Sequence, residues 1–157
     1  MRKLGLFALV LALWAAPRPA SAGFFVEGSL GVPWHTNPEI YREPTNVLIT
    51  PGYAFLDLLS VELGFVGNSA QFKQSGSWGL RPMLGLRPPF MPVYAKLIFD
   101  FNDIGHQRVN SVGGAVGLTF LSVSKIGLFV EGDYIPRKTN GVYLNVLEAR
   151  LGVSIGI

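Results

Sequence analysis

The sequence predicts an all-β protein, an eight-stranded antiparallel up-and-down transmembrane β-barrel that follows a cleaved signal peptide. Three observations carry this prediction. A short apolar leader begins the chain, eight later segments alternate apolar and polar residues with period two, and the connections between them alternate in length. Together these features are typical of a barrel whose strands turn one face to lipid and the other to a filled interior.

The leader has the three parts of a secretory signal peptide. Arg2 and Lys3 precede an apolar run, 4–16, and Ala20-Ser21-Ala22 offers a small-residue cleavage site. A membrane-spanning helix needs roughly 20 apolar residues, which this run does not reach. We therefore predict that residues 1–22 are removed and that residues 23–157 form one outer-membrane barrel domain.

The composition excludes several classes of protein. The chain has no cysteine, which rules out disulfides and a lipid anchor on cysteine. Its 13 basic residues fall to 10 when Arg2, Lys3 and Arg18 leave with the leader, which equals the 10 acidic residues, so nothing suggests a nucleic-acid partner. Hydrophobic residues make up 49% of the sequence, yet no second run reaches the length of a membrane helix.

Each predicted strand is an alternating segment near the length of about 9 to 11 residues that a tilted membrane strand requires, the last being longer. Helices are disfavoured because glycine or proline interrupts every long window. Pro51 and Pro82 fall inside strands, and we expect a bulge or a local shift at each. In chain order the predicted strands are 24–32, 46–56, 60–68, 78–87, 92–102, 111–122, 125–135 and 142–157.

The connections alternate between long polar loops and short turns, as in an up-and-down barrel with both termini on the short-turn side. The predicted long loops are Pro33–Thr45, Ser69–Ser77, Asp103–Asn110 and Pro136–Gly141. The predicted short turns are Asp57–Leu59, Pro88–Met91 and Val123–Ser124.

The alternation separates an apolar face from a charged one. In the last segment Leu147, Leu151 and Val153 share a face, whereas Glu148 and Arg150 share the other. A soluble barrel turns its apolar face inward around a ligand, and a membrane barrel turns it outward. Aromatic residues near both ends of the apolar face resemble the two interfacial girdles and favour the membrane barrel, with a soluble secreted ligand-binding barrel as the alternative.

The charged face is therefore predicted to line the interior, which in an eight-stranded barrel is only wide enough for side chains to fill. We expect a packed network of ion pairs rather than a gated ion path. Suggested partners are Glu27 for Glu148 and Arg150, and Arg81 or Arg87 for Lys96 and Asp100. The predicted network comprises Glu27, Glu62, Arg81, Arg87, Lys96, Asp100, Glu131, Asp133, Glu148 and Arg150.

With its leader, its eight segments and its ending 151–157, the chain resembles the small outer-membrane β-barrels of the OmpA/OmpX type. The ending is similar to the C-terminal signal that the barrel-assembly machinery recognises, although Ile157 stands where phenylalanine is usual. The resemblance implies export through the periplasm, an outer-membrane location, and contact with outer-membrane lipid and lipopolysaccharide. Such barrels serve as envelope stabilisers, interaction surfaces, narrow channels or lipid A-modifying enzymes.

No pattern of catalytic or metal-ligating residues accompanies the predicted barrel. His35 and His106 are isolated in predicted loops, neither has the His-x-Ser pairing of lipid A deacylases, and no spacing supports a triad of His35, Asp103 and Ser111. Isolated histidines are usually surface residues, and we expect no enzyme, metal or cofactor.

The first loop is the richest predicted external segment. Trp34, Tyr41 and Arg42 are residue types favoured in recognition sites, and Trp34 and Tyr41 could equally anchor the loop at lipid headgroups. The sequence thus predicts a non-enzymatic outer-membrane barrel with a structural or surface-interaction role and a polar, plugged interior. The alternatives are a narrow channel for small or hydrophobic solutes, a lipid A-modifying enzyme and the soluble barrel.

Overall fold

The computed structural model describes residues 23–36, 39–55, 58–68, 79–89, 91–104, 107–139 and 142–157. The predicted signal peptide, the predicted loop Ser69–Ser77 and His106 lie outside these residues.

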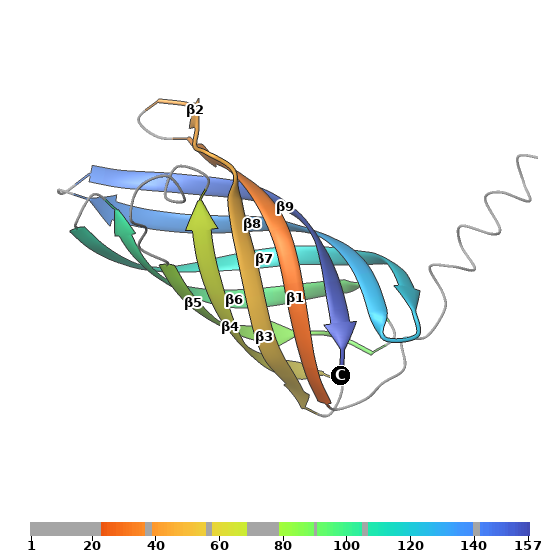
Figure 1. Ribbon diagram of the computed structural model, residues 1–157. Coiled ribbons are helices and arrows are strands. Elements are labelled where there is room, and N and C mark those ends of the chain that lie inside the picture. The colour runs from red at the N-terminus through yellow and green to blue at the C-terminus, as the bar shows by residue number, and fades with distance from the viewer. Residues whose placement is uncertain are drawn as a thin grey trace, which may run out of the picture.

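The described residues form a closed antiparallel barrel of eight long strands (Figure 1). From β3 to β9 each strand pairs with the next, and β1 pairs with both β3 and β9 to close the sheet. The two-residue β2 adds to the end of β1. This confirms the predicted eight-stranded antiparallel barrel. The elements are β1 (Gly23–His35), β2 (Tyr41–Arg42), β3 (Asn46–Phe55), β4 (Leu59–Asn68), β5 (Gly79–Leu86), β6 (Val93–Ile104), β7 (Gln107–Val123), β8 (Ile126–Thr139) and β9 (Val142–Gly156).

Two of the predicted long loops are wrong. The β6–β7 ladder continues to Ile104 opposite Gln107, and the β8–β9 ladder continues to Thr139 opposite Val142. The segments predicted as loops, 103–110 and 136–141, are therefore mostly the ends of long hairpins. Lys138, whose side chain is described, is exposed on the outer face, so the apolar alternation of β8 has stopped there although strand pairing goes on. Similarly, β1 extends to His35, three residues into the predicted first loop.

The two prolines interrupt pairing without shifting it. Between β3 and β4 the ladder passes from Ile49–Phe65 to Gly52–Glu62 in one register, and Pro51 still pairs with Val26 on the other side. Pro82 behaves in the same way, paired with β4 but not with β6. The expected bulges are absent because a missing N–H removes one bond while its neighbours hold the register. Among the described ladders, the register shift lies between Thr119 and Leu121, against β8.

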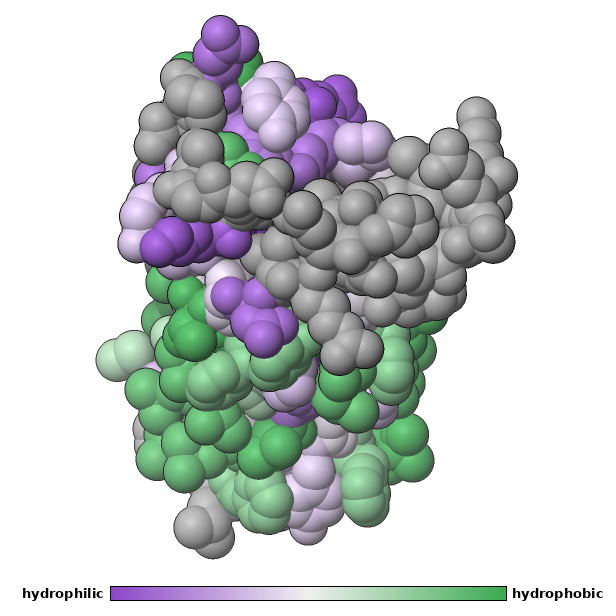
Figure 2. All heavy atoms as spheres, turned by 90° about the vertical axis from the view of Figure 1, so that its left-hand side faces the viewer, coloured by the Kyte–Doolittle hydropathy of each residue, from purple (hydrophilic) through white to green (hydrophobic). Residues whose placement is uncertain are grey.

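Side chains alternate between the barrel interior and its outer surface, as period-two geometry requires. Along β1, Phe25 and Glu27 are buried, while Phe24, Val26 and Leu30 are exposed. Figure 2 shows apolar side chains over the lower part of one face and polar ones gathered at the upper end, where β2 lies in Figure 1. The outer surface is thus apolar over the part of the barrel away from β2. Among the described residues, no helix is long and apolar enough to cross a membrane.

Leu97, in the middle of β6, tests this facing because its side chain points outward and is 43% exposed. In lipid vesicles Leu97→Arg should lower the free energy of unfolding by about 2 to 4 kcal/mol, the cost of a charge near the bilayer midplane. Urea unfolding measures the difference, with Leu97→Ala as the uncharged control. Equal urea midpoints for the two variants would contradict the outward assignment.

Candidate functional site

The structure places all ten residues of the predicted charge network inside the barrel. Nine of them are no more than 5% exposed, and the side chain of Arg87 is 16% exposed at the short-turn end. Charged residues on the same strand are separated by an even number of positions, so they lie on the same face of the sheet. In a closed barrel that face is the interior. We distinguish a turn-side cluster, near the short turns, from a loop-side cluster, toward the end where β2 lies.

The turn-side cluster gathers two cations around three glutamates. The Lys96 ammonium lies 2.8 Å from Glu27 Oε2, 3.0 Å from Glu62 Oε2 and 3.1 Å from Glu131 Oε2. Arg87 Nη2 donates at 2.8 Å to both Glu27 and Glu62. These charges come from β1, β4, β6, β8 and the end of β5, so the cluster joins strands around the whole barrel.

Aromatic rings pack against the same two cations. The Lys96 ammonium lies 5.2 Å from the ring centre of Tyr94 and 5.8 Å from that of Phe129. The Arg87 guanidinium lies 5.0 Å from the Phe25 ring and 4.8 Å from the Tyr94 ring. At these distances the ring faces attract the cations, which offsets part of their loss of water.

The loop-side cluster is built on two arginines. Arg81 Nε donates to Asp100 at 2.9 Å, and its Nη1 lies 3.4 Å from Asp133 and 3.3 Å from Glu148. Arg150 bonds the same two carboxylates, with Nε 2.8 Å from Asp133 and Nη2 2.7 Å from Glu148. Arg81 on β5 thus bridges carboxylates from β6, β8 and β9, and Arg150 bridges Asp133 on β8 and Glu148 on its own strand, a geometry suited to the planar fork of donors of arginine.

Sequence reasoning missed the residues that extend this cluster to the end of the barrel. Arg137, predicted in a loop, is buried on β8 and donates to Asp100 at 3.1 Å. His35, expected at the surface, is buried, and its ring stacks on that of Tyr41 with 4.3 Å between the ring centres. His35 also hydrogen-bonds the Glu43 carboxylate, whose Oε2 lies 3.9 Å from Arg137 Nη1. The alternation of side chains could have identified both residues. His35 is an even number of positions from the inward-facing Glu27, and Arg137 is an even number of positions from the inward-facing Glu131.

The three predicted loop contacts lie around this end of β1. Trp34 points outward and pairs with Arg42, which is exposed. Tyr41 covers His35 with one ring face and is 49% exposed overall. Partial burial and the neighbouring Glu43 carboxylate raise the pKa of the Tyr41 phenol. The side chain therefore stays neutral to a higher pH than an isolated tyrosine does.

The suggested ion pairs were partly right. Arg81 does contact Asp100, but Glu27 and Arg150 lie in different clusters. The β1–β9 register sets Gly31 opposite Arg150 and Ser154 opposite Glu27, so the two charges are four positions apart along β1. Alternation predicts which face a residue occupies and leaves the register between strands open.

Packing inside the barrel is tight against the wall. A methyl group on Gly31 would lie 2.1 Å from a Glu148 oxygen, and one on Gly117 would lie 2.1 Å from the Tyr94 ring. An apolar cluster of Leu48, Val66, Met83, Ile98 and Ala115 fills part of the remaining core. Charged, aromatic and aliphatic side chains thus share the interior and contact one another across it.

Catalytic groups do not assemble in the described part of the barrel. Ser111 and His35 are described, but the side chain of Asp103 and all of His106 lie outside the described residues. Among the described residues, no three histidine or acidic side chains are grouped as a metal site would need.

Comparison with solved structures identifies this architecture. The crystal structure of Neisserial surface protein A (NspA) matches with a TM-score of 0.59 and 15% sequence identity, over 87% of this chain and 98% of that chain. The chain has the fold of a transmembrane β-barrel. A structure described as de novo design of transmembrane β-barrels matches at a TM-score of 0.54 and 15% identity, over 88% of this chain and 99% of that chain. No protein-family model matches the chain, and the search of curated proteins found no relative.

Arg81 is the side chain whose loss should cost the network most, because it contacts three buried carboxylates. Arg81→Leu should lower the free energy of unfolding by about 3 to 5 kcal/mol, since it leaves buried negative charge unpaired. Denaturant unfolding in lipid vesicles measures the loss. Arg42→Leu, at an exposed position, is the control and should change stability by no more than about 0.5 kcal/mol. Similar small effects of both changes would contradict the network.

Proposed function

We propose that the protein is a non-enzymatic outer-membrane β-barrel with a structural or surface-interaction role and an interior closed to solutes. The apolar outer surface suits a bilayer, and the fold likeness to a neisserial surface protein agrees with this location. Under this proposal the chain is exported through the periplasm before it inserts.

The buried charge network carries the proposal. A solute crossing the barrel would have to separate Lys96 and Arg81 from carboxylates at about 3 Å, in a space already filled by side chains. Breaking one such buried pair by removing a partner costs several kcal/mol, and each cluster holds several pairs. A ready path for ions is therefore not expected, and function is assigned to the surface of the barrel.

The outer ends of the barrel supply surfaces for contacts. We assign lipopolysaccharide and outer-membrane lipid as surroundings of the apolar face, with Trp34, Tyr41 and Arg42 available at the loop-side end. The C-terminal segment exposes Val153, Ile155 and Ile157, which suits recognition by the barrel-assembly machinery. Nothing in the site calls for nucleic acid.

Planar-bilayer recording tests the closed interior. The reconstituted protein should give no discrete conductance steps, because paired side chains fill its interior. The double variant Arg81→Ala with Arg150→Ala removes two large side chains from the loop-side cluster and should show steps or increased leak. Regular steps from the unmodified protein would overturn the proposal and favour a narrow channel.

A further inference from the structure

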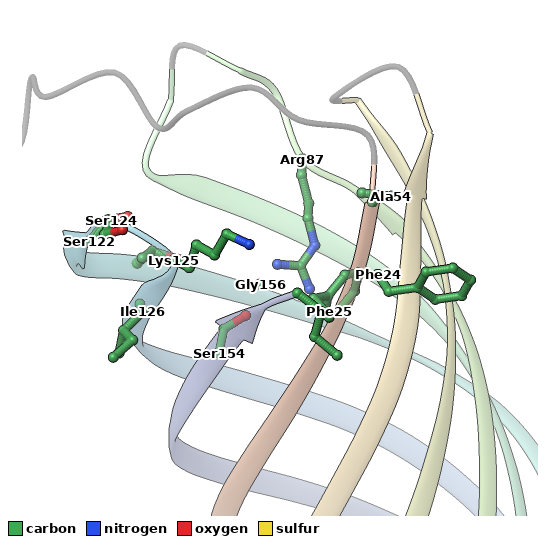
Figure 3. Close-up of a pocket in the computed structure, with 14 residues that line it drawn as sticks. Phe24, Phe25, Ala54, Arg87, Ser122, Ser124, Lys125, Ile126, Ser154 and Gly156 are labelled. Carbon is green, nitrogen blue, oxygen red and sulfur yellow. The ribbon is translucent and has the colours of Figure 1, made fainter.

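A cavity of about 190 Å³ opens at the short-turn end of the barrel, beside the turn-side cluster (Figure 3). The start of β1, the β7–β8 turn, the end of β9 and Arg87 line it. The cavity adjoins the turn-side cluster, because Arg87 belongs to both.

Among the described residues that line the cavity, two are cations and none is acidic, although Arg87 is also paired with Glu27 and Glu62 of the turn-side cluster. In Figure 3 a guanidinium nitrogen of Arg87 and the ammonium of Lys125 point toward one another across the cavity. Glu27 and Glu62 balance the charge of Arg87, so Lys125 is the cation whose charge an anion in the cavity would balance. Arg87 Nη2 makes the bonds to both glutamates, and the side chain is still 16% exposed at this end of the barrel.

Hydroxyl groups complete the lining. Thr119, Ser122, Ser124 and Ser154 come from β7, the β7–β8 turn and β9. Ser124 has φ 55°, at the first position of a two-residue turn where glycine is easier to accommodate. Figure 3 shows the Ser154 hydroxyl on the side of the two cations, and the Ser122 and Ser124 hydroxyls at the turn, apart from the Lys125 ammonium.

We propose that this cavity binds a phosphate group, with Arg87 and Lys125 as its charge partners and the Ser154 hydroxyl as a further donor. A phosphate presents several strong acceptor oxygens, so it can satisfy donors that converge from several sides, whereas a halide offers one atom. Exposed Phe24, Ile126 and Ile157 on the same rim bring membrane lipid close to the cavity. The phosphate therefore belongs either to a phospholipid headgroup or to a small solute.

Titration of the full-length protein with inorganic phosphate tests the site, in micelles of an uncharged, phosphate-free detergent. Phosphorus NMR line widths should show saturable binding. Lys125→Gln should weaken it about tenfold, because a charge-assisted bond is lost, and Lys125→Arg should retain it. Lys138→Gln, an exposed lysine at the other end of the barrel, is the matched control and should leave binding unchanged.

A second titration with short-chain phosphatidylglycerol separates the two sources. Tighter binding than inorganic phosphate, with the same loss in Lys125→Gln, assigns a lipid headgroup, and weaker or equal binding assigns a small phosphate. Absence of saturation with both probes would overturn the inference. Equal losses in Lys125→Gln and Lys138→Gln would also overturn it, because they would indicate general attraction of anions.

Discussion

Hydrogen bonding of the backbone is the constraint on which this structure depends. Within hydrocarbon no water can satisfy an unpaired N–H or C=O group, so a sheet that crosses a membrane must close on itself. Here β1 and β9 provide the closure, over eleven opposed residue pairs from Phe25 to His35. Closure then determines the environment of every side chain, because alternate residues along a strand face either lipid or a narrow interior.

The interior follows from this division. Charged residues that share the inward parity cannot reach bulk water, and each must find an opposite charge from another strand. Lys96 and Arg81 each meet three carboxylates, and Glu43 from the segment after β2 approaches Arg137 at the loop-side end. The same pairs that fill the barrel therefore connect strands distant in sequence, and a change at one cation is expected to affect several strands.

Sequence alone predicted the eight strands, their order and the inward face, because period-two alternation is a local signal. It did not predict where hairpins end. The residues of β8 beyond Ile135 are paired strand, but Pro136 and Lys138 resemble loop residues because lipid no longer selects apolar side chains there. The sequence also could not predict the ion-pair partners, because these depend on the register between neighbouring strands. Glu27 and Arg150, which were expected to pair, lie in different clusters for this reason. Parity could have identified His35 and Arg137, had the strands been extended.

The central claim is that this chain is a barrel with its apolar face outward and its charges inside. Heat-modifiability tests it most directly: residues 23–157 are refolded into detergent micelles, and boiled and unboiled samples are compared by gel mobility and circular dichroism. The account predicts a β-type spectrum and a mobility difference between the two samples. Folding into a soluble β protein without detergent would contradict it, because the apolar face would then have to lie inside.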